Sequence, residues 1–292
     1  MKYLIVKGGL LGFGDRLESL KMAVNYAIHN NLQIYVDWRD PVWSHGSEDF
    51  YTYFKLVNMP VLRSLSDIPE DATYYPSHWK GRLDDQLTLE YFDKYKDANL
   101  NIGYLNRPFD GDVIVYSCIG NRILFTDSTF FGNVFRVVDN RILEKVRYHA
   151  SRKPLAQSWG VHIRGTDRTK TVNRRMMSIQ SIVTNFTMMG GMNMKNMVVV
   201  SDDREQTQIW KNYYPDSYIV SEASLKNSNI LGNHLQGKDS LNVSKDDMNV
   251  DLLVDFFVLT SCERVFTTVK DSRFAQEARR LHPHVNRILS GV

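Results

Sequence analysis

The sequence is poor in cysteine and contains no long apolar run. Its 292 residues include only two cysteines, Cys118 and Cys262, each inside an apolar segment far from the other. We therefore expect two free, buried thiols rather than a disulfide framework. No stretch of eighteen apolar residues is present, so no membrane-spanning helix is predicted. The first residues, MKYLIVK, run directly into glycines without the features of a secretory signal, and we expect a cytoplasmic protein.

The chain also lacks a dominant charge and the signatures of several enzyme classes. The 36 basic and 33 acidic side chains leave a net charge of +3, with no basic stripe of the kind that nucleic-acid binding requires. No group of His, Cys and carboxylate residues has the spacing of metal ligands, so no metal is expected. No Gly-x-Ser-x-Gly elbow or catalytic cysteine signature is found, and covalent acyl chemistry has no support. Oligomeric state is left open.

What is present is an alternation of short apolar runs with helical patterns. This alternation predicts an α/β protein with parallel sheets. The length and the 43% content of hydrophobic residues suit two cores. We expect two Rossmann-like domains, residues 1–152 and 153–292, which meet near Lys153-Pro154 and face an interdomain cleft that holds the ligand.

The expected elements follow the period of the apolar residues. Strands are expected over 3–6, 33–36, 112–117, 158–163, 197–201, 217–221, 264–268 and 286–289, and helices over 16–30, 141–151, 178–189, 205–213, 251–261 and 272–281. Residues 41–116 carry aromatic loops and short helices without clear periodicity, and the polar residues 222–249 suggest a mobile loop or a lid.

A glycine-rich loop, GGLLGFGD, separates the first strand from the first helix. Gly12, Phe13 and Gly14 precede a helix N-terminus, where backbone N–H groups can bind an anion or a sugar hydroxyl. The glycine spacing matches neither dinucleotide-binding proteins nor phosphate loops. On the loop alone, a tight turn in which Asp15 caps the helix is the favoured interpretation, and other features must decide for a ligand.

Polar side chains end three of the expected strands in the second half. His162 and Arg164 alternate along one strand, which stops at Thr166-Asp167, and an arginine there can hold a diphosphate through two hydrogen bonds. The other polar strand ends are Ser201, Asp202 and Asp203, and Thr267, Thr268, Asp271 and Ser272. Helix capping accounts for some of these residues, but it does not explain why three strands all end in polar side chains. This pattern predicts a ligand site at the carboxyl ends of the strands.

The helix expected over 251–261 carries two carboxylates on an otherwise apolar pattern. Asp251 and Asp255 lie four residues apart and so share one face. A buried carboxylate requires a partner, and the edge of a guanine base offers suitable donors. Exposure to solvent beside Arg264 is the alternative, more so for Asp251 than for Asp255.

These segments together resemble the α-1,6-fucosyltransferase superfamily, above all the bacterial nodulation fucosyltransferases. The resemblance rests on residues 8–40, on VHIRGTD, on VVVSDDREQTQIWKNYYPDSYIVS and on DLLVDFFVLTSCERVFTTVKDSRFAQEARRL, and it omits residues 41–150. It implies a GT-B fold and an inverting, metal-independent transfer of fucose from GDP-fucose to a saccharide hydroxyl.

The resemblance also assigns roles to individual residues. Arg164 is expected to hold the β-phosphate, and His162 and Asp255 are expected near the guanosine. The residues expected near the phosphates are Thr267, Thr268 and Ser272, and the glycine loop is expected to face the donor. The remaining candidates for donor binding are Ser201, Asp202 and Asp271.

Two positions depart from the family pattern. Gly165 stands where the family has a second arginine, and no acidic residue between Arg168 and Asn173 replaces the family glutamate that can act as a base. Asp167 is the substitute candidate for the general base, with Asp15 and Asp40 as alternatives. Aromatic residues Trp38, Trp43, Tyr51 and Tyr53 are expected to stack on the acceptor.

Three further interpretations are kept open at this point. One is a glycosyltransferase with a different nucleotide sugar. Another is a nicotinamide-dependent oxidoreductase, for which Asp37 stands about where a ribose-binding acid belongs. The third is a protein that binds a sugar nucleotide or a glycan without catalysis, in line with the missing glutamate.

Overall fold

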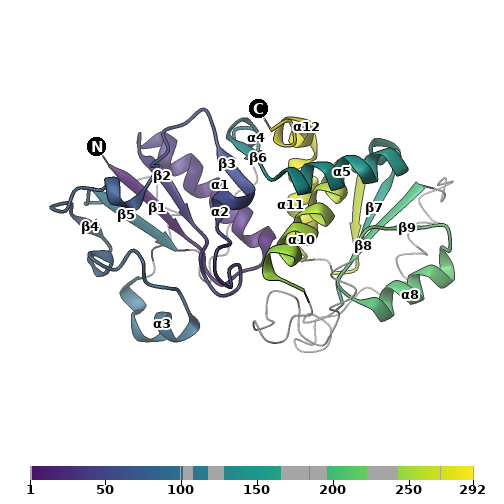
Figure 1. The fold of residues 1–292 in the computed structure, drawn as a ribbon, viewed down its shortest axis with the longest axis horizontal. Helices are drawn as coiled ribbons and strands as arrows, with labels where there is room; N and C mark the ends of the chain where they lie inside the picture. Colours follow the sequence, from purple (N-terminus) through teal and green to yellow (C-terminus); the bar gives the residue numbers. More distant parts are fainter. Residues whose placement is uncertain are drawn as a thin grey trace. The chain divides into compact units, whose positions relative to one another are not determined.

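The chain folds into two compact units, each built on a parallel four-stranded sheet (Figure 1). The computed structural model describes residues 2–98, 100, 108–117, 128–165, 184, 196–221, 243–269 and 271–291. The first unit comprises residues 1–139 together with 286–292, and the second comprises residues 140–285. The α/β class with two Rossmann-like halves is thereby confirmed. The helix that was expected to close the first half belongs to the second unit.

The sheet of the first unit has the strand order β2-β1-β5-β4, and all its pairings are parallel. Its strands are β1 (Tyr3–Lys7), β2 (Gln33–Asp37), β4 (Tyr74–Tyr75) and β5 (Val113–Ser117). A separate antiparallel pair joins β3 (Phe54–Leu56) to β6 (Phe135–Val137). The helices are α1 (Phe13–His29), α2 (Phe50–Tyr53), α3 (Leu89–Lys94), α4 (Phe131–Val134) and α12 (Val285–Ile288), and the 3-10 helices are η1 (Leu65–Asp67), η2 (Ser77–Trp79) and η3 (Lys96–Ala98).

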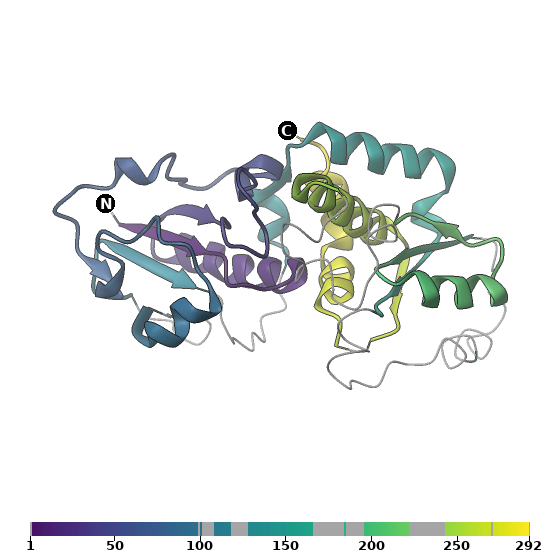
Figure 2. The same ribbon diagram turned by 60° about the horizontal axis from the view of Figure 1, so that its bottom comes forward.

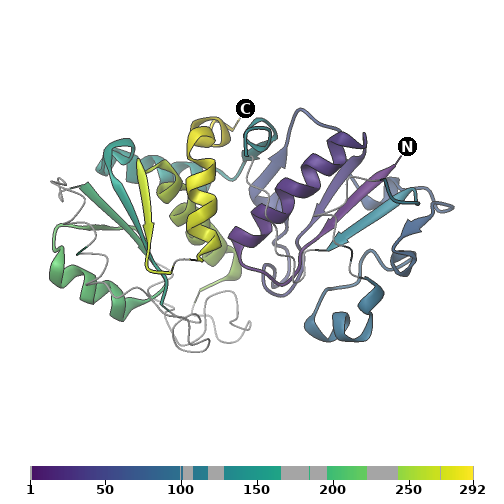
Figure 3. The ribbon, with the colours of Figure 1, turned by 180° about the vertical axis from the view of Figure 1, so that it is seen from behind.

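Every residue of β1 and β5 is buried, which shows that both faces of this sheet are covered. Tyr3, Ile5 and Val113 contribute to one apolar cluster, which also contains Trp79 from the segment after β4. The other face carries α1, the purple helix that runs beside the strands in Figure 3. The aromatic-rich segment 41–116, which gave no periodic signal, thus supplies one wall of the core.

The sheet of the second unit has the order β10-β7-β8-β9 and is again entirely parallel. Its strands are β7 (Trp159–Ile163), β8 (Met197–Ser201), β9 (Tyr218–Ile219) and β10 (Arg264–Thr267). The described helices are α5 (Asn140–Arg152), α8 (Arg204–Tyr213), α10 (Lys245–Ser261) and α11 (Arg273–Leu281), with the 3-10 helices η4 (Leu155–Gln157) and η8 (His282–His284).

Helices cover this second sheet on opposite sides, with α8 on one side and α10 and α11 on the other (Figures 1 and 2). Trp210 of α8 packs with Val161 and Val199 on the first face. On the second face α10 packs on β7 and β8 and also against α5 and α11. Alternation along β7 therefore turns His162 away from the α8 side and toward α10 and α11.

Several expected boundaries move, and one expected strand is wrong. Helix α1 begins at Phe13 with Gly12 as its N-cap, so Asp15 lies in the first turn and is not the cap. Helix α10 begins at Lys245 rather than at residue 251. Residues 286–289, expected as a strand, lie mainly in helix α12, since a short apolar run does not by itself distinguish the two. The helix expected over 178–189 falls on residues that the structure does not describe, apart from 184.

The last residues of the chain belong to the first unit. Gly291 accepts a hydrogen bond at its backbone oxygen from Nζ of Lys55, at 3.1 Å. Arg287 donates a hydrogen bond to the side chain of Asn133. The chain thus leaves the first unit after residue 139 and returns to it at residue 286.

Candidate functional site

The carboxyl ends of β7 and β8 bring Arg164 and Asp202 together. In the parallel register Ile163 lies opposite Ser201, so the residues that follow the two strands are neighbours. Arg164 forms an ion pair with Asp202, whose side chain is 9% exposed, and the other carboxylate oxygen accepts the backbone N–H of Gly165 at 2.9 Å. The Arg164 side chain is itself only 22% exposed, which strengthens its electrostatic interactions. Asp202 thus holds both the arginine and the backbone that follows it.

Gly165, the position of the missing second arginine, has no room for a side chain. A Cβ built there would lie 2.2 Å from Oδ2 of Asp203 and 2.5 Å from its Cβ. Asp203 is fixed in turn, because it caps α8 by accepting the N–H of Gln206 at 3.0 Å. The departure from the family pattern is therefore built into the packing of the site.

His162 is a buried, uncharged imidazole next to this ion pair. Its Nδ1 lies 3.3 Å from Oγ1 of Thr267 and 3.2 Å from Oγ of Ser272, and its ring packs on Phe274 with 5.0 Å between centroids. Burial lowers the pKa of His162 from 6.5 to about 4, so the imidazole is neutral at physiological pH. A neutral imidazole can donate or accept a hydrogen bond, but it adds no charge for a phosphate.

Several of the polar residues at the ends of β10 and β8 have structural roles. Thr268 accepts the N–H of Arg164 at 2.9 Å, which extends the pairing of β10 with β7. Ser272 caps α11, as predicted. Asp271 is exposed. The hydroxyl of Ser201 is bonded to the backbone of Asp203 at 3.0 Å, which shapes the turn into α8.

Asp255 of α10 is the most unusual group in this part of the molecule. Ser221 donates a hydrogen bond to Oδ2 of Asp255 and itself accepts the N–H of Ser201 at 2.7 Å, which ties the carboxylate to the end of β8. Oδ1 is buried and has no hydrogen-bond partner in the described part of the chain. Burial, aided by the neighbouring charge of Asp251, raises the pKa of Asp255 well above its ordinary value. A buried oxygen of this kind calls for a donor beyond the contacts described.

The glycine loop of the first unit leads into a buried cluster of aromatic side chains. Phe13 is 3% exposed and stacks on Trp43 and Phe54 at 5.9 and 5.8 Å between centroids. Gly14 lies buried inside α1, and Gly12 precedes it. Trp38, Trp43 and Tyr53 are all at most 2% exposed, and Tyr51 accepts the N–H of Val36 at 3.1 Å. The expected stacking on an acceptor is therefore wrong for Trp38, Trp43 and Tyr53, because these three side chains form a core.

Among the candidates for a general base, Asp40 is fully engaged. Both its oxygens accept hydrogen bonds from Arg16, at 2.7 and 2.8 Å, and both side chains are 2% exposed. Asp15 lies half-buried in the first turn of α1. Asp167 lies outside the described residues.

Among the residues that the structure describes, no group of His, Cys, Asp and Glu side chains is arranged to hold a metal. No helix among them is long and apolar enough to span a membrane.

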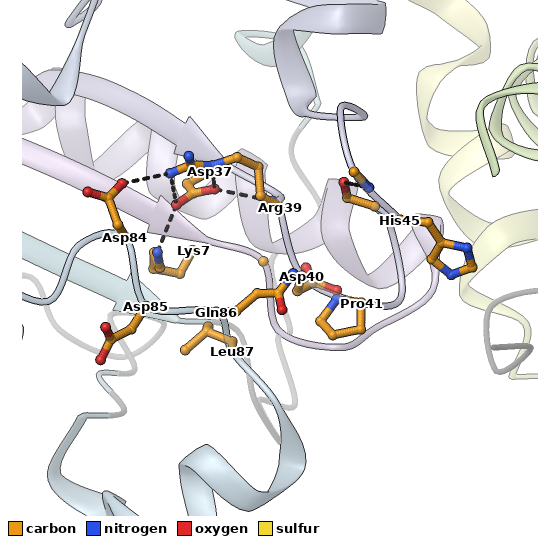
Figure 4. Close-up of a pocket in the computed structure, with 13 residues that line it drawn as sticks. Lys7, Asp37, Arg39, Asp40, Pro41, His45, Asp84, Asp85, Gln86 and Leu87 are labelled. Atoms are coloured by element: carbon orange, nitrogen blue, oxygen red, sulfur yellow. Dashed lines mark hydrogen bonds and ion pairs between the residues drawn. The ribbon is translucent and has the colours of Figure 1, made fainter. Parts of the chain in front are cut away.

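A polar pocket of about 380 Å³ opens at the carboxyl ends of β1 and β2 in the first unit (Figure 4). Lys7 and Asp37, the last residues of these strands, form a buried ion pair at 2.7 Å. Arg39 joins them by donating to both oxygens of Asp37, at 2.9 and 3.1 Å. Asp37 is thereby fully occupied and unsuited to bind the ribose of a nicotinamide nucleotide, which removes the main support for the oxidoreductase interpretation.

The ionisation of Asp37 predicts a defined loss of stability in acid. Burial alone would raise the pKa of Asp37, but hydrogen bonds from Arg39 and the charge of Lys7 outweigh it and lower the pKa from 3.8 to about 2. Because the pKa is lower in the folded state, the ionised Asp37 stabilises the fold by about 2 kcal/mol. This contribution is present above pH 4 and is lost as the pH falls toward 2 and the carboxylate takes up a proton. In urea titrations, the wild type should lose about this much more free energy of unfolding than Asp37→Asn between pH 5 and pH 2.

The matched control for this measurement is Asp93→Asn, which changes an exposed carboxylate of α3. Its pH dependence should follow that of the wild type. Parallel curves for the wild type and Asp37→Asn would show that Asp37 carries no such stabilisation.

Comparison with solved structures identifies the class of fold. Neither a protein-family model nor a curated protein sequence matches the chain. The structure nevertheless superposes over nearly its whole length on glycosyltransferases, and its fold is the GT-B fold of the fucosyltransferases.

Three solved structures illustrate this likeness. NodZ alpha-1,6-fucosyltransferase soaked with GDP-fucose is matched with a TM-score of 0.69 and 16% identity, over 97% of this chain and 94% of the other. POFUT1 in complex with GDP-fucose gives 0.54 and 10% identity, over 97% and 95%. A mutant of FUT1 from Arabidopsis thaliana in complex with GDP gives 0.52 and 14% identity, over 97% and 69%. At these identities the likeness establishes the fold.

Proposed function

We propose that this protein is an inverting, metal-independent glycosyltransferase that binds a GDP-sugar, with GDP-fucose as the first candidate, and transfers the sugar to a saccharide hydroxyl. The observation that carries this proposal is the unpartnered, buried Oδ1 of Asp255 beside the end of β8. Guanine offers two adjacent N–H donors on one edge, and a carboxylate accepts both. The fold is that of solved structures that contain GDP or GDP-fucose, which supports the same donor.

Arg164 is the residue proposed to hold the diphosphate. Its guanidinium sits at the end of β7, where open α/β sheets bind ligands, and stays charged at every working pH. When the bond from the sugar to the β-phosphate breaks, negative charge grows on the phosphate oxygen, and a fixed guanidinium stabilises it. Asp202 keeps the guanidinium in place before the donor arrives.

The remaining residues shape the donor site around these two groups. His162, neutral and held at Nδ1, is proposed to contact the base or the ribose. The acceptor proton requires a carboxylate within hydrogen-bond reach, and Asp167 is proposed for that role. The proposed location is the cytoplasm.

Calorimetric titration with GDP, UDP and NAD in metal-free buffer tests the proposal. We expect GDP to bind and UDP and NAD to bind far more weakly. Arg164→Ala should weaken GDP binding at least about tenfold, because one charge-assisted hydrogen bond contributes about 1.5–3 kcal/mol. The control is Arg152→Ala, which changes an exposed arginine of α5 whose guanidinium lies over the ring of Tyr148.

Each outcome has a distinct meaning. Binding of NAD, or failure of GDP to bind, contradicts the proposed donor. Preference for UDP would retain the glycosyltransferase and change its donor. GDP-fucose that binds without any hydrolysis or transfer across a saccharide panel would indicate a binding protein without catalysis.

A further inference from the structure

The second unit carries another pocket, at the end of its sheet opposite the proposed donor site. Its volume is about 350 Å³, within the range of small-molecule sites. The lining comes from residues 262–266, which lead into and begin β10, and from Arg279 and His282 at the end of α11. Thr267 and Ser272, which were expected near the phosphates, lie at the other ends of β10 and α11. The pocket is therefore separate from the donor site.

Arg279 is an exposed residue whose guanidinium is nevertheless partly withdrawn from water. Its Nε donates to the backbone oxygen of Val265 at 2.8 Å, which restrains the plane of the guanidinium. Nη1 and Nη2 make no hydrogen bond or ion pair within the described part of the chain. Burial lowers the pKa of Arg279, and no neighbouring charge offsets this effect. Part of the water around this cation has thus been removed without an opposite charge in its place, which favours a bound anion.

His282 and Arg264 are held in a similar way. Nδ1 of His282 lies 2.8 Å from the backbone oxygen of Thr260, so this nitrogen carries a proton and Nε2 remains for a ligand. The guanidinium of Arg264 lies over the ring of Trp159, 5.1 Å from its centroid. Each side chain is therefore oriented by one contact that leaves further nitrogen atoms available.

The lining combines an excess of positive charge with an apolar surface. Glu263 lies 4.0 Å from Nε of Arg264, and both side chains are 52% exposed, so this ion pair contributes little. Even when the pair is counted in full, Arg279 remains uncompensated. Phe266 adds an aromatic wall, because its ring lines the pocket and stacks on Trp159 with 4.8 Å between centroids.

We propose that this pocket binds a small organic anion, an aromatic carboxylate or phosphate, with its charged group at Arg264 and Arg279 and its ring on Phe266. The inference does not depend on the proposed function, because the pocket shares no lining residue with the donor site. Guanidinium groups bind carboxylates and phosphates alike through paired hydrogen bonds, and the choice of probes distinguishes the two.

The first experiment compares phenyl phosphate, benzoate and benzyl alcohol by ligand-observed NMR and calorimetry. The full chain is used as wild type and as Arg164→Ala, so that binding at the proposed donor site is recognised. We expect phenyl phosphate to bind with a Kd of about 1 mM or below, and benzoate to bind more weakly because it carries less charge. Benzyl alcohol, which is neutral, should bind at least about tenfold more weakly than phenyl phosphate. Arg164→Ala should change none of these values, and added salt should weaken both anions.

Variants then locate the binding in the pocket. Arg279→Gln and Arg264→Gln should each weaken phenyl phosphate at least about tenfold, since each removes a charge-assisted hydrogen bond. Glu263→Gln removes the carboxylate from the lining and should tighten the binding about twofold, a gain that misfolding cannot produce. Arg152→Gln, which changes an exposed arginine of α5 outside the lining, should have no effect.

The outcomes separate the head groups and the sites. Tighter binding of benzoate than of phenyl phosphate would support the pocket and identify the carboxylate as its head group. The proposal is overturned if neither anion binds, if benzyl alcohol binds as tightly, or if neither arginine variant weakens the binding. It is also overturned if Arg164→Ala abolishes the binding, because the anion would then lie at the donor site.

Discussion

Replacing Gly8 with alanine should destabilise the protein by about 4 kcal/mol, since it forces apart a buried ion pair. A Cβ at Gly8 would lie 1.8 Å from Oδ2 of Asp40 and 2.8 Å from Nη1 of Arg16. Neither side chain can move into solvent, because both are 2% exposed and joined by two hydrogen bonds. Urea unfolding followed by fluorescence gives the free energy directly.

Two controls make this result specific. Gly12→Ala adds the same methyl group in the same loop, where the nearest atom, Oδ2 of Asp15, is 3.9 Å away, and it should cost less than about 1 kcal/mol. Adding Asp40→Ala to Gly8→Ala should cost much less than Asp40→Ala alone, because the first change has already disrupted the pair. A Gly8→Ala protein within about 1 kcal/mol of the wild type would refute this account of the loop.

Asp255→Asn should act in opposite directions on stability and on GDP binding. The pKa of Asp255 is raised in the folded state, so its contribution to stability is complete below pH 3.8 and is lost as the pH rises toward the folded pKa. The amide removes this loss, and the variant should gain about 2 kcal/mol in the free energy of unfolding at pH 8. GDP binding should fall by about 30-fold or more, because an amide cannot accept from both guanine donors as a carboxylate does.

The pH dependence of binding gives a second measure of the same group. Guanine N–H donors favour the ionised carboxylate, so GDP binding to the wild type should release a proton and tighten as the pH rises. Asp255→Asn should lose this dependence. Asp251→Asn, one helical turn earlier on α10, is the matched control and should retain it. A variant that loses stability and keeps its affinity for GDP would remove Asp255 from the proposed donor site.

The sequence predicted most of the second unit because apolar runs there end in polar residues. β7, β8 and β10 were placed within one residue, and Asp203 and Ser272 cap helices as expected. The partner of Arg164 was not foreseen. Asp202 lies 38 residues away, and the pair follows only once the register of Ile163 with Ser201 is known.

The first unit was harder to predict, for a different physical reason. The loop around Gly8 has the composition of a ligand loop, yet tertiary packing of Arg16 and Asp40 explains the glycine. Residues 83–87 carry no periodic pattern, and Leu83 is held by Lys7, 76 residues away, rather than by a helix or strand of its own. Local sequence does not encode such long-range attachments.

The return of residues 286–292 to the first unit has a consequence for synthesis. A ribosome completes residues 1–139 long before it adds residues 286–292, so this unit lacks Arg287 and the carbonyl of Gly291 until that later segment has been made. The unit that emerges first is thus the last to be finished, whereas residues 140–285 are contiguous and can close during elongation. Deletion of residues 286–291 should accordingly disturb the unit built from residues 1–139, which is the more distant one in sequence.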